Sequence, residues 1–145
     1  MKIEVEIARQ ADQELVEVFS RLLPQLSTSA RPLDAEAVGR IVACDANTVL
    51  IARADREIVG TLILVMVPVP SGLRARVEDV VVDAAARGHG VAGLLMQKAL
   101  QTARDAGART VDLTSRPDRE AANRLYGRLG FRVRESTVYR LAFDS

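Results

Sequence analysis

The sequence has little of what builds disulfides or metal sites. Among its 145 residues, Cys44 is the only cysteine and His89 the only histidine. One cysteine cannot form a disulfide within the chain, and one cysteine with one histidine cannot complete a zinc site, so we expect no metal. Cys44 falls near the end of a predicted helix, and we expect it to be a small buried apolar residue rather than a nucleophile.

Net charge and long apolar runs are also nearly absent. The 20 basic and 19 acidic residues leave a formal charge of +1, which predicts no general attraction to nucleic acid or to an anionic membrane. The longest apolar run, 58–69, is far shorter than the roughly 20 residues that span a bilayer, and acids at Glu4 and Glu6 interrupt any signal-peptide core. These features predict a soluble cytoplasmic protein.

Hydrophobic periodicity divides the chain into alternating elements. It predicts strands over 2–8, 47–54, 58–67, 77–82, 110–114, 131–133 and 137–143, and helices over 11–23, from Asp34, over 90–106 and over 117–129. The first helix should end at Pro24, and Pro117 should lie in the first turn of the last helix. Leu94 should face inward with Leu95. The strand over 110–114 follows a crossover helix and should be parallel to its predecessor.

These elements predict one α/β domain over residues 1–145. Its sheet is expected to be mixed and mostly antiparallel, with about six or seven strands, a central parallel step and about four flanking helices. The sequence shows no internal repeats, low-complexity segments or linkers.

A glycine-rich turn, Gly88-His-Gly-Val-Ala-Gly93, joins the apolar strand through Val77–Val82 to the third helix. Free backbone N–H groups and the positive end of the helix dipole converge at such a turn, so we expect it to bind phosphate. The spacing also fits a dinucleotide site, with Asp112 as the ribose acid, although the motif comes late in the chain. A third alternative is a glycine turn that merely connects the strand to the helix.

Two motifs in sequence order favour one family. The stretch Arg87-Gly-His-Gly-Val-Ala92 resembles the Gln/Arg-x-x-Gly-x-Gly/Ala signature of the GNAT acyl-CoA-dependent N-acetyltransferases. Ala121-Ala-Asn-Arg-Leu-Tyr-Gly-Arg-Leu-Gly-Phe131 resembles that family's second motif. The predicted order of elements is also similar to the GNAT arrangement over nearly the whole chain.

The resemblance implies an acyltransferase that moves an acetyl group from acetyl-CoA directly to a primary amine of a small molecule or peptide. The turn amides would hold the coenzyme pyrophosphate, and the preceding strand would pair with the pantetheine arm. The coenzyme-binding residues would then be Val80, Val81, Val82, Arg87, Gly88, His89, Gly90, Val91, Ala92, Gly93 and Asn123. Arg87 could instead be an exposed cap of the turn, and we expect the His89 side chain to face solvent.

Two further residues have candidate catalytic roles from the resemblance. Glu78 would act as general base through water, or would form a structural salt bridge with Arg74 or Arg76. Tyr126 would protonate the departing thiolate, since a tyrosine hydroxyl is protonated at neutral pH, or would be a core aromatic. Asp79 should point to the opposite face of the strand and be structural.

Other interpretations stay open. A non-catalytic acyl-CoA-binding or protein-interaction domain of the same fold would carry the same motifs. Homodimerisation through the late strands is a family-level expectation. Nothing in the sequence identifies the amine acceptor.

Overall fold

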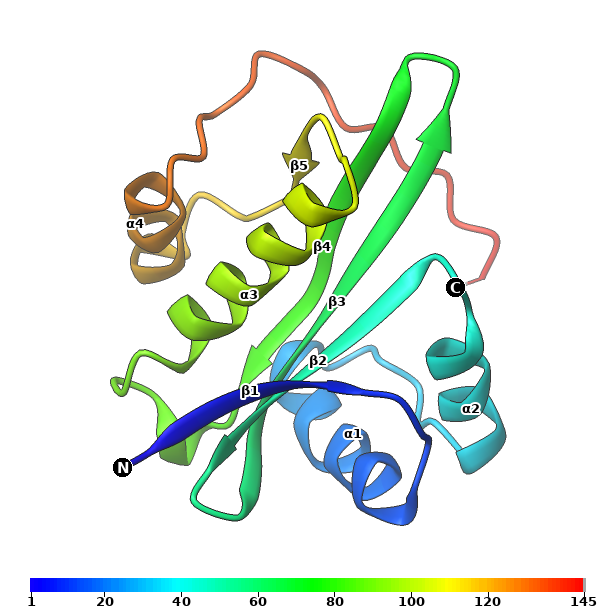
Figure 1. Ribbon diagram of the computed structural model, residues 1–145, viewed down its shortest axis with the longest axis vertical. Coiled ribbons are helices and arrows are strands. Elements are labelled where there is room, and N and C mark those ends of the chain that lie inside the picture. Colours follow the sequence, from blue (N-terminus) through cyan, green and yellow to red (C-terminus); the bar gives the residue numbers. More distant parts are fainter. Residues whose placement is uncertain (145) are drawn as a thin grey trace. The chain divides into compact units, whose positions relative to one another are not determined.

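Ten short elements make up the structure, a computed structural model that describes residues 1–144 (Figure 1). In chain order they are β1 (Ile3–Ala8), α1 (Gln13–Leu26), α2 (Ala35–Ala43), β2 (Asn47–Ala54), β3 (Glu57–Val69), β4 (Gly72–Val82), the 3-10 helix η1 (Ala84–Ala86), α3 (Val91–Asp105), β5 (Val111–Asp112) and α4 (Glu120–Arg128). The chain separates into two units, Met1–Thr114 and the residues from Ser115 onward. No described helix is both long and apolar enough to cross a membrane.

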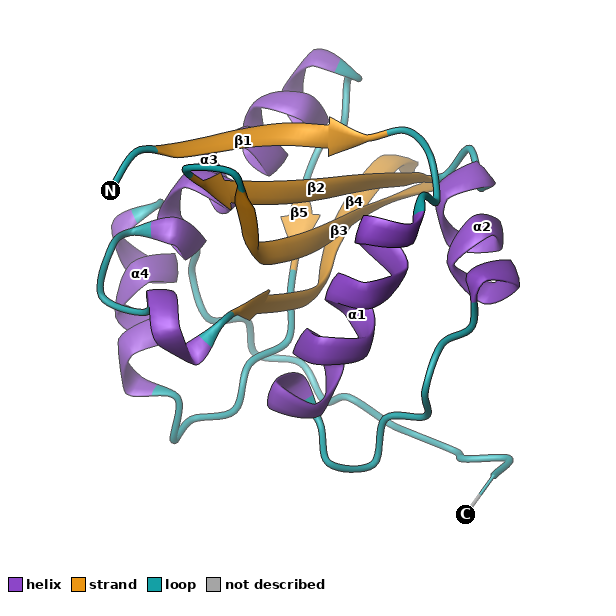
Figure 2. Ribbon diagram, turned by 90° about the horizontal axis from the view of Figure 1, so that it is seen from below, coloured by secondary structure: helices purple, strands orange, loops and turns teal. Residues whose placement is uncertain are grey.

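The first unit is built on a five-stranded sheet in the order β1-β2-β3-β4-β5 (Figure 2). The first four strands are antiparallel neighbours, and β4 and β5 are parallel. This arrangement confirms the predicted mixed, mostly antiparallel sheet with one parallel step. The number of strands is slightly lower than predicted.

Helices cover both faces of this sheet (Figure 1). On the face of α1 and α2, the core contains Leu15, Val18, Phe19, Leu22, Val38, Val49, Ile51, Ile58, Ile63 and Val81. On the other face α3 buries Val91, Leu95, Met96, Ala99 and Ala103. Both faces of the central strands are therefore buried, which explains their long apolar runs.

Side-chain caps start the two early helices, and the second cap confirms the predicted start at Asp34. The Asp12 carboxylate accepts a hydrogen bond from the Leu15 amide at 2.9 Å, and Asp34 accepts one from the Ala37 amide at 2.8 Å. Each cap satisfies an amide that has no partner within its helix. Helix α1 does not stop at Pro24 as predicted, but continues to Leu26. A proline there removes only the hydrogen bond to the Ser20 carbonyl, and the last turn still closes.

Several sequence expectations for single residues are wrong. Leu94 is exposed, because it lies beside the buried stripe of α3 rather than on it. Cys44 is exposed at the C-terminus of α2. Pro117 precedes α4, which begins only at Glu120. The parallel strand expected over 110–114 contains only Val111–Asp112.

The second unit contains α4 and the residues around it. Gly130, with a φ of 102°, follows the helix, and the Phe131 amide then donates to the Tyr126 carbonyl at 3.0 Å. The predicted strands over 131–133 and 137–143 are not formed. Alternating apolar residues give a segment strand propensity, but a strand also needs a hydrogen-bonded partner, and no described strand pairs with these residues.

Candidate functional site

The glycine-rich turn projects into solvent at the start of α3. Residues 87–90 are all exposed, and Gly88 and Gly90 have φ values of 87° and 76°. Only glycine adopts this left-handed backbone region without a steric cost. A Cβ built on either glycine would have nothing within 4 Å, so their conformation, and not crowding, selects glycine here.

The amides that open α3 have no side-chain partner. Gly90 is the N-cap residue and makes no side-chain cap, and the first amide with a helical acceptor is that of Leu94, which donates to the Gly90 carbonyl at 3.2 Å. Helices α1 and α2 are capped by aspartates, whereas no side chain caps the first turn of α3. Uncapped amides and the helix dipole together favour an anionic group at this point.

Strand β4 has one open edge next to this turn. It pairs with β3 along most of its length, but with β5 only at Ala75 and Arg76. Among the described residues, no strand pairs with the other edge of β4 over 77–82. The main chain there can accept an extended amide-containing ligand by strand addition. Val81 is buried in the core, while Val80 and Val82 are half-buried.

A β-bulge interrupts β4 within that open edge. Ile63 pairs with Glu78 and Thr61 pairs with Val81, so Leu62 of β3 lies opposite two residues of β4. Asp79 is one of these two and has a φ of 51°, which is uncommon for a residue with a side chain. The bulge therefore breaks the regular alternation of faces between Glu78 and Val81, and the placement of Asp79 on the face opposite Glu78 stays a prediction.

The two acids at the bulge have different surroundings. Glu78 accepts a hydrogen bond from Nε of Arg76 at 3.0 Å, the salt bridge considered as its structural alternative. The same arginine donates to the Thr114 hydroxyl at 3.2 Å. Asp79 is accessible to solvent, but its neighbours remove part of the water around its carboxyl. This desolvation, with a smaller repulsion from Glu78, raises the pKa of Asp79 above its usual 3.8.

In the second unit, α4 carries two of the predicted site residues. Tyr126 is buried, and its ring meets that of Phe131 edge to face at 6.0 Å between centroids. The Asn123 amide group donates to the Arg116 carbonyl at 3.0 Å and holds the preceding loop. This contact gives Asn123 a local structural role in addition to any contact with a coenzyme.

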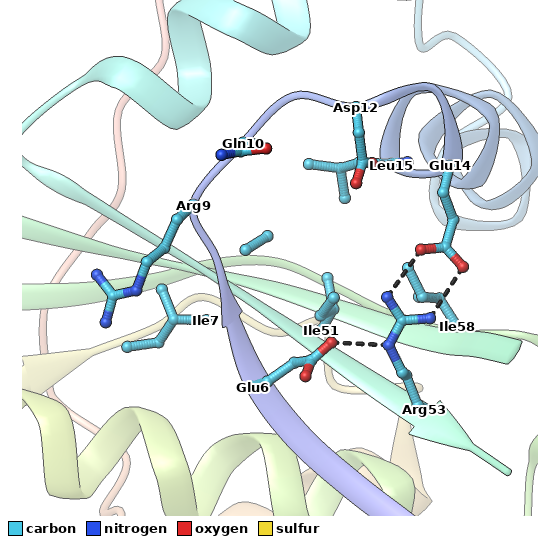
Figure 3. A pocket seen from close by; sticks show the side chains of 11 residues that line it. Glu6, Ile7, Arg9, Gln10, Asp12, Glu14, Leu15, Ile51, Arg53 and Ile58 are labelled. Atoms are coloured by element: carbon cyan, nitrogen blue, oxygen red, sulfur yellow. Dashed lines mark hydrogen bonds and ion pairs between the residues drawn. The ribbon is translucent and has the colours of Figure 1, made fainter. Parts of the chain in front are cut away.

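A separate pocket lies against β1 and the start of α1 (Figure 3). It has a volume of about 300 Å³, and none of the predicted site residues lines it. Arg53 forms a two-bond contact with Glu14, with distances of 2.9 and 2.7 Å, and donates to Glu6 at 2.7 Å. The hydrogen bonds from Arg53 lower the pKa of Glu14, and the two glutamates raise the pKa of Arg53. The guanidinium group of Arg53 thus joins α1 to the first two strands.

Three features near the turn were not predicted from the sequence. Gly60 of β3 is buried under the first turns of α3, and its only sequence signal is a glycine inside a strand pattern. Arg21 and Gln25 of α1 contact the residues just before the turn. The bulge at Asp79 gives no signal in a single sequence.

In this mixed sheet a strand, a glycine turn and an uncapped helix meet beside an open strand edge, an arrangement typical of proteins that bind an extended ligand with an anionic group. The profile of the Acetyltransferase (GNAT) family matches residues 13–131, and the chain belongs to this family. It is an acyltransferase, and GNAT proteins generally use acetyl-CoA. None of the curated proteins matches the chain in sequence.

Solved structures similar to this one include several acetyltransferases. A Trypanosoma brucei acetyltransferase is 25% identical with a TM-score of 0.80, and the match covers 98% of this chain and 100% of the other. A transcriptional regulator from Bacillus halodurans C-125 is also 25% identical, with a TM-score of 0.81 and the same coverage. An aminoglycoside acetyltransferase from an uncultured soil metagenomic sample has a TM-score of 0.83 at 16% identity, covering 99% and 97% of the chains, and shows likeness of fold alone.

Proposed function

We propose that this protein transfers an acetyl group from acetyl-CoA directly to a primary amine of a small molecule or peptide. The observation that supports this most is the uncapped N-terminus of α3 behind an exposed glycine turn, next to the open edge of β4. One half of this arrangement suits a pyrophosphate and the other an extended chain of amides. Coenzyme A contains both groups in sequence.

In this proposal the main chain does most of the binding. The amides of Gly88–Gly93 donate to the pyrophosphate, and the backbone of Val80–Val82 pairs with the pantetheine arm. Arg87 and His89 are exposed, and we propose both side chains as further contacts with a phosphate. Asn123 is proposed as a further contact, although its amide nitrogen already holds the loop before α4.

Acetyl transfer also needs a base and an acid. The coenzyme supplies an activated thioester, and the protein must accept a proton from the amine and return one to the thiolate. We assign the first task to Glu78, acting through water, and the second to the Tyr126 hydroxyl. Nε of Arg76 donates to Oε1 of Glu78, and we assign the contact with water to the other carboxylate oxygen.

The proposed acceptor is a primary amine of a small molecule or peptide. Similar structures include a ribosomal-protein-alanine N-acetyltransferase and aminoglycoside acetyltransferases. An acceptor of this chain is proposed to lie between the early helices, the segment 25–32 and the residues 68–76. Release of free thiol from acetyl-CoA, measured with polyamines, amino acids, aminoglycosides, amino sugars and peptide N-termini, would identify its class. Coenzyme binding without turnover on any of them would favour the non-catalytic alternative.

The glycine turn allows a sharp test of coenzyme binding. Asparagine and aspartate both tolerate a left-handed backbone, so Gly90→Asn and Gly90→Asp should perturb the fold equally. They are almost the same size and differ in charge. If a pyrophosphate binds here, Gly90→Asp should weaken coenzyme A binding by at least about tenfold more than Gly90→Asn, a difference typical of one misplaced charge near an anion. Equal affinities in calorimetry would contradict the assignment.

Homodimerisation stays a prediction, and the exposed apolar residues near the C-terminus support it. Val133, Val138, Tyr139, Leu141 and Phe143 are 70–101% exposed in the described structure. Several large apolar side chains exposed along one segment favour association with another surface. Sedimentation equilibrium of the wild type and of Leu141→Lys would test whether self-association depends on this segment.

A further inference from the structure

Two side chains of α1 hold the short segment that leads into the glycine turn. Arg21 forms an ion pair with Asp83 and also donates to the Ile58 carbonyl at 3.0 Å. One helical turn later, the Gln25 side-chain oxygen accepts a hydrogen bond from the Ala84 amide at 2.9 Å. An i, i+4 pair lies on one helix face, so both contacts come from the same side of α1.

Asp83 is the centre of these contacts. One of its carboxylate oxygens pairs with Arg21, and the other accepts from the Ala85 amide at 3.2 Å and so caps η1. Its own amide donates to the Val59 carbonyl at 2.7 Å. The Asp83 side chain is only 18% exposed, which distinguishes this pair from the open surface pairs that contribute little.

The contacts with Asp83 and Ala84 are not needed to hold α1 itself. That helix buries Leu15, Val18, Phe19 and Leu22 against the sheet, and these four side chains fix it in place. The segment from Asp83 to Ala86 has one short 3-10 turn and only one buried side chain, Ala86. The restraint therefore acts mainly on this segment and on the residues that follow it.

We propose that Arg21 and Gln25 are positioning residues for coenzyme binding, an inference that rests on the proposed function. They restrain Asp83 and Ala84, and through them the direction in which the turn amides point. The turn contains two left-handed glycines, which give it backbone freedom that a bound phosphate must remove. Fixing the entry to the turn lowers the entropic cost of binding, and hence raises coenzyme affinity.

The test compares coenzyme A affinity and kinetics in three variants and one control. Arg21→Met keeps the aliphatic stem but removes the ion pair, Gln25→Met removes the acceptor for Ala84, and Arg21→Lys retains the charge. The control, Arg40→Met, breaks the exposed Arg40–Glu36 pair of α2, which lies at 3.3 Å. Each methionine variant at positions 21 and 25 should raise the Kd for coenzyme A about five- to tenfold, the cost of one lost hydrogen-bonded contact.

The other readouts separate positioning from general stability. The KM for acetyl-CoA should rise while kcat and the KM for the amine stay near wild type, and Arg21→Lys should recover part of the affinity. In the free protein, amide hydrogen exchange over residues 84–90 should be faster in Arg21→Met and unchanged in Arg40→Met. This readout needs no coenzyme.

Two results would overturn the inference. Unchanged exchange over 84–90 would show that the contacts do not order the turn. Wild-type coenzyme affinity in folded Arg21→Met and Gln25→Met would show that the order has no effect on binding. A wild-type protein that binds no coenzyme A would instead refute the proposed function, while exchange would still report whether α1 orders the turn.

Discussion

Gly60 sets how closely α3 approaches the sheet, and replacing it should expose that dependence. A Cβ at this position would lie 3.0 Å from Cγ1 of Val91, 3.1 Å from Cδ1 of Leu95 and 3.3 Å from the Val81 carbonyl oxygen. Neighbours at such distances must move by a few tenths of an ångström. Because Val91 is the first residue of α3, Gly60→Ala should displace the start of the helix and the amides of the turn.

The magnitude follows from two opposing effects. Adding a methyl group to a well-packed core costs about 1–3 kcal/mol. Replacing glycine within a strand recovers about 0.5–1 kcal/mol, because the unfolded chain has less freedom to lose. The net loss of unfolding free energy is about 1 kcal/mol, which corresponds to a decrease in Tm of about 2–4 °C for a chain of this size.

The matched control is Gly39→Ala on α2, where an added Cβ has nothing within 4 Å. There the helix propensity of alanine should stabilise the protein by about 1 kcal/mol. Urea unfolding should thus show opposite changes in stability for the two variants. Calorimetry with coenzyme A should show weaker binding in Gly60→Ala alone. If Gly60→Ala stabilised the protein as much as Gly39→Ala, this result would contradict the claim that close packing of α3 over β3 fixes the position of the turn.

Three further outcomes are expected. Hydrogen bonds to Arg53 lower the pKa of Glu14 in the folded protein. The contribution of Glu14 to stability is therefore full above the usual pKa of 4.5 and is lost as the pH falls through the lowered pKa. Glu14→Gln should reduce Tm at pH 7 by the equivalent of at most about 1 kcal/mol and have no effect near pH 2. The pKa of Asp79 is raised, so ionisation there costs stability above the folded pKa, and Asp79→Asn should raise Tm at pH 7 but not below the usual 3.8. Tyr126→Phe should lower kcat by about 100-fold or more with little change in coenzyme affinity, as expected for loss of a general acid; equal losses in both would indicate packing instead.

Features that depend on near neighbours in the chain could be predicted from the sequence. The Asp34 cap, the start of α3 at the glycine turn and its end before Gly107 all follow from residues within a few positions of one another. The parallel step was predictable because a crossover helix leaves little choice of direction. The contacts of Arg21 with Asp83 and of Gln25 with Ala84 were not, since they join residues about 60 positions apart whose types are common on any surface.

The bulge in β4 shows why the candidate acids could not be placed from the sequence. Before the bulge, Glu78 shares a face of the sheet with Ile63, and after it Val81 shares the same face with Thr61. In an unbroken strand, residues 78 and 81 would lie on opposite faces, because side chains alternate strictly. One inserted residue thus brings an acid and a core valine to the same side. It also leaves Asp79 in a left-handed conformation, three residues beyond Arg76, where the pairing with β5 ends. The sequence shows that β4 carries two acids. Which of them faces a ligand depends on the register between β4 and β3, and this register is set only in the folded sheet.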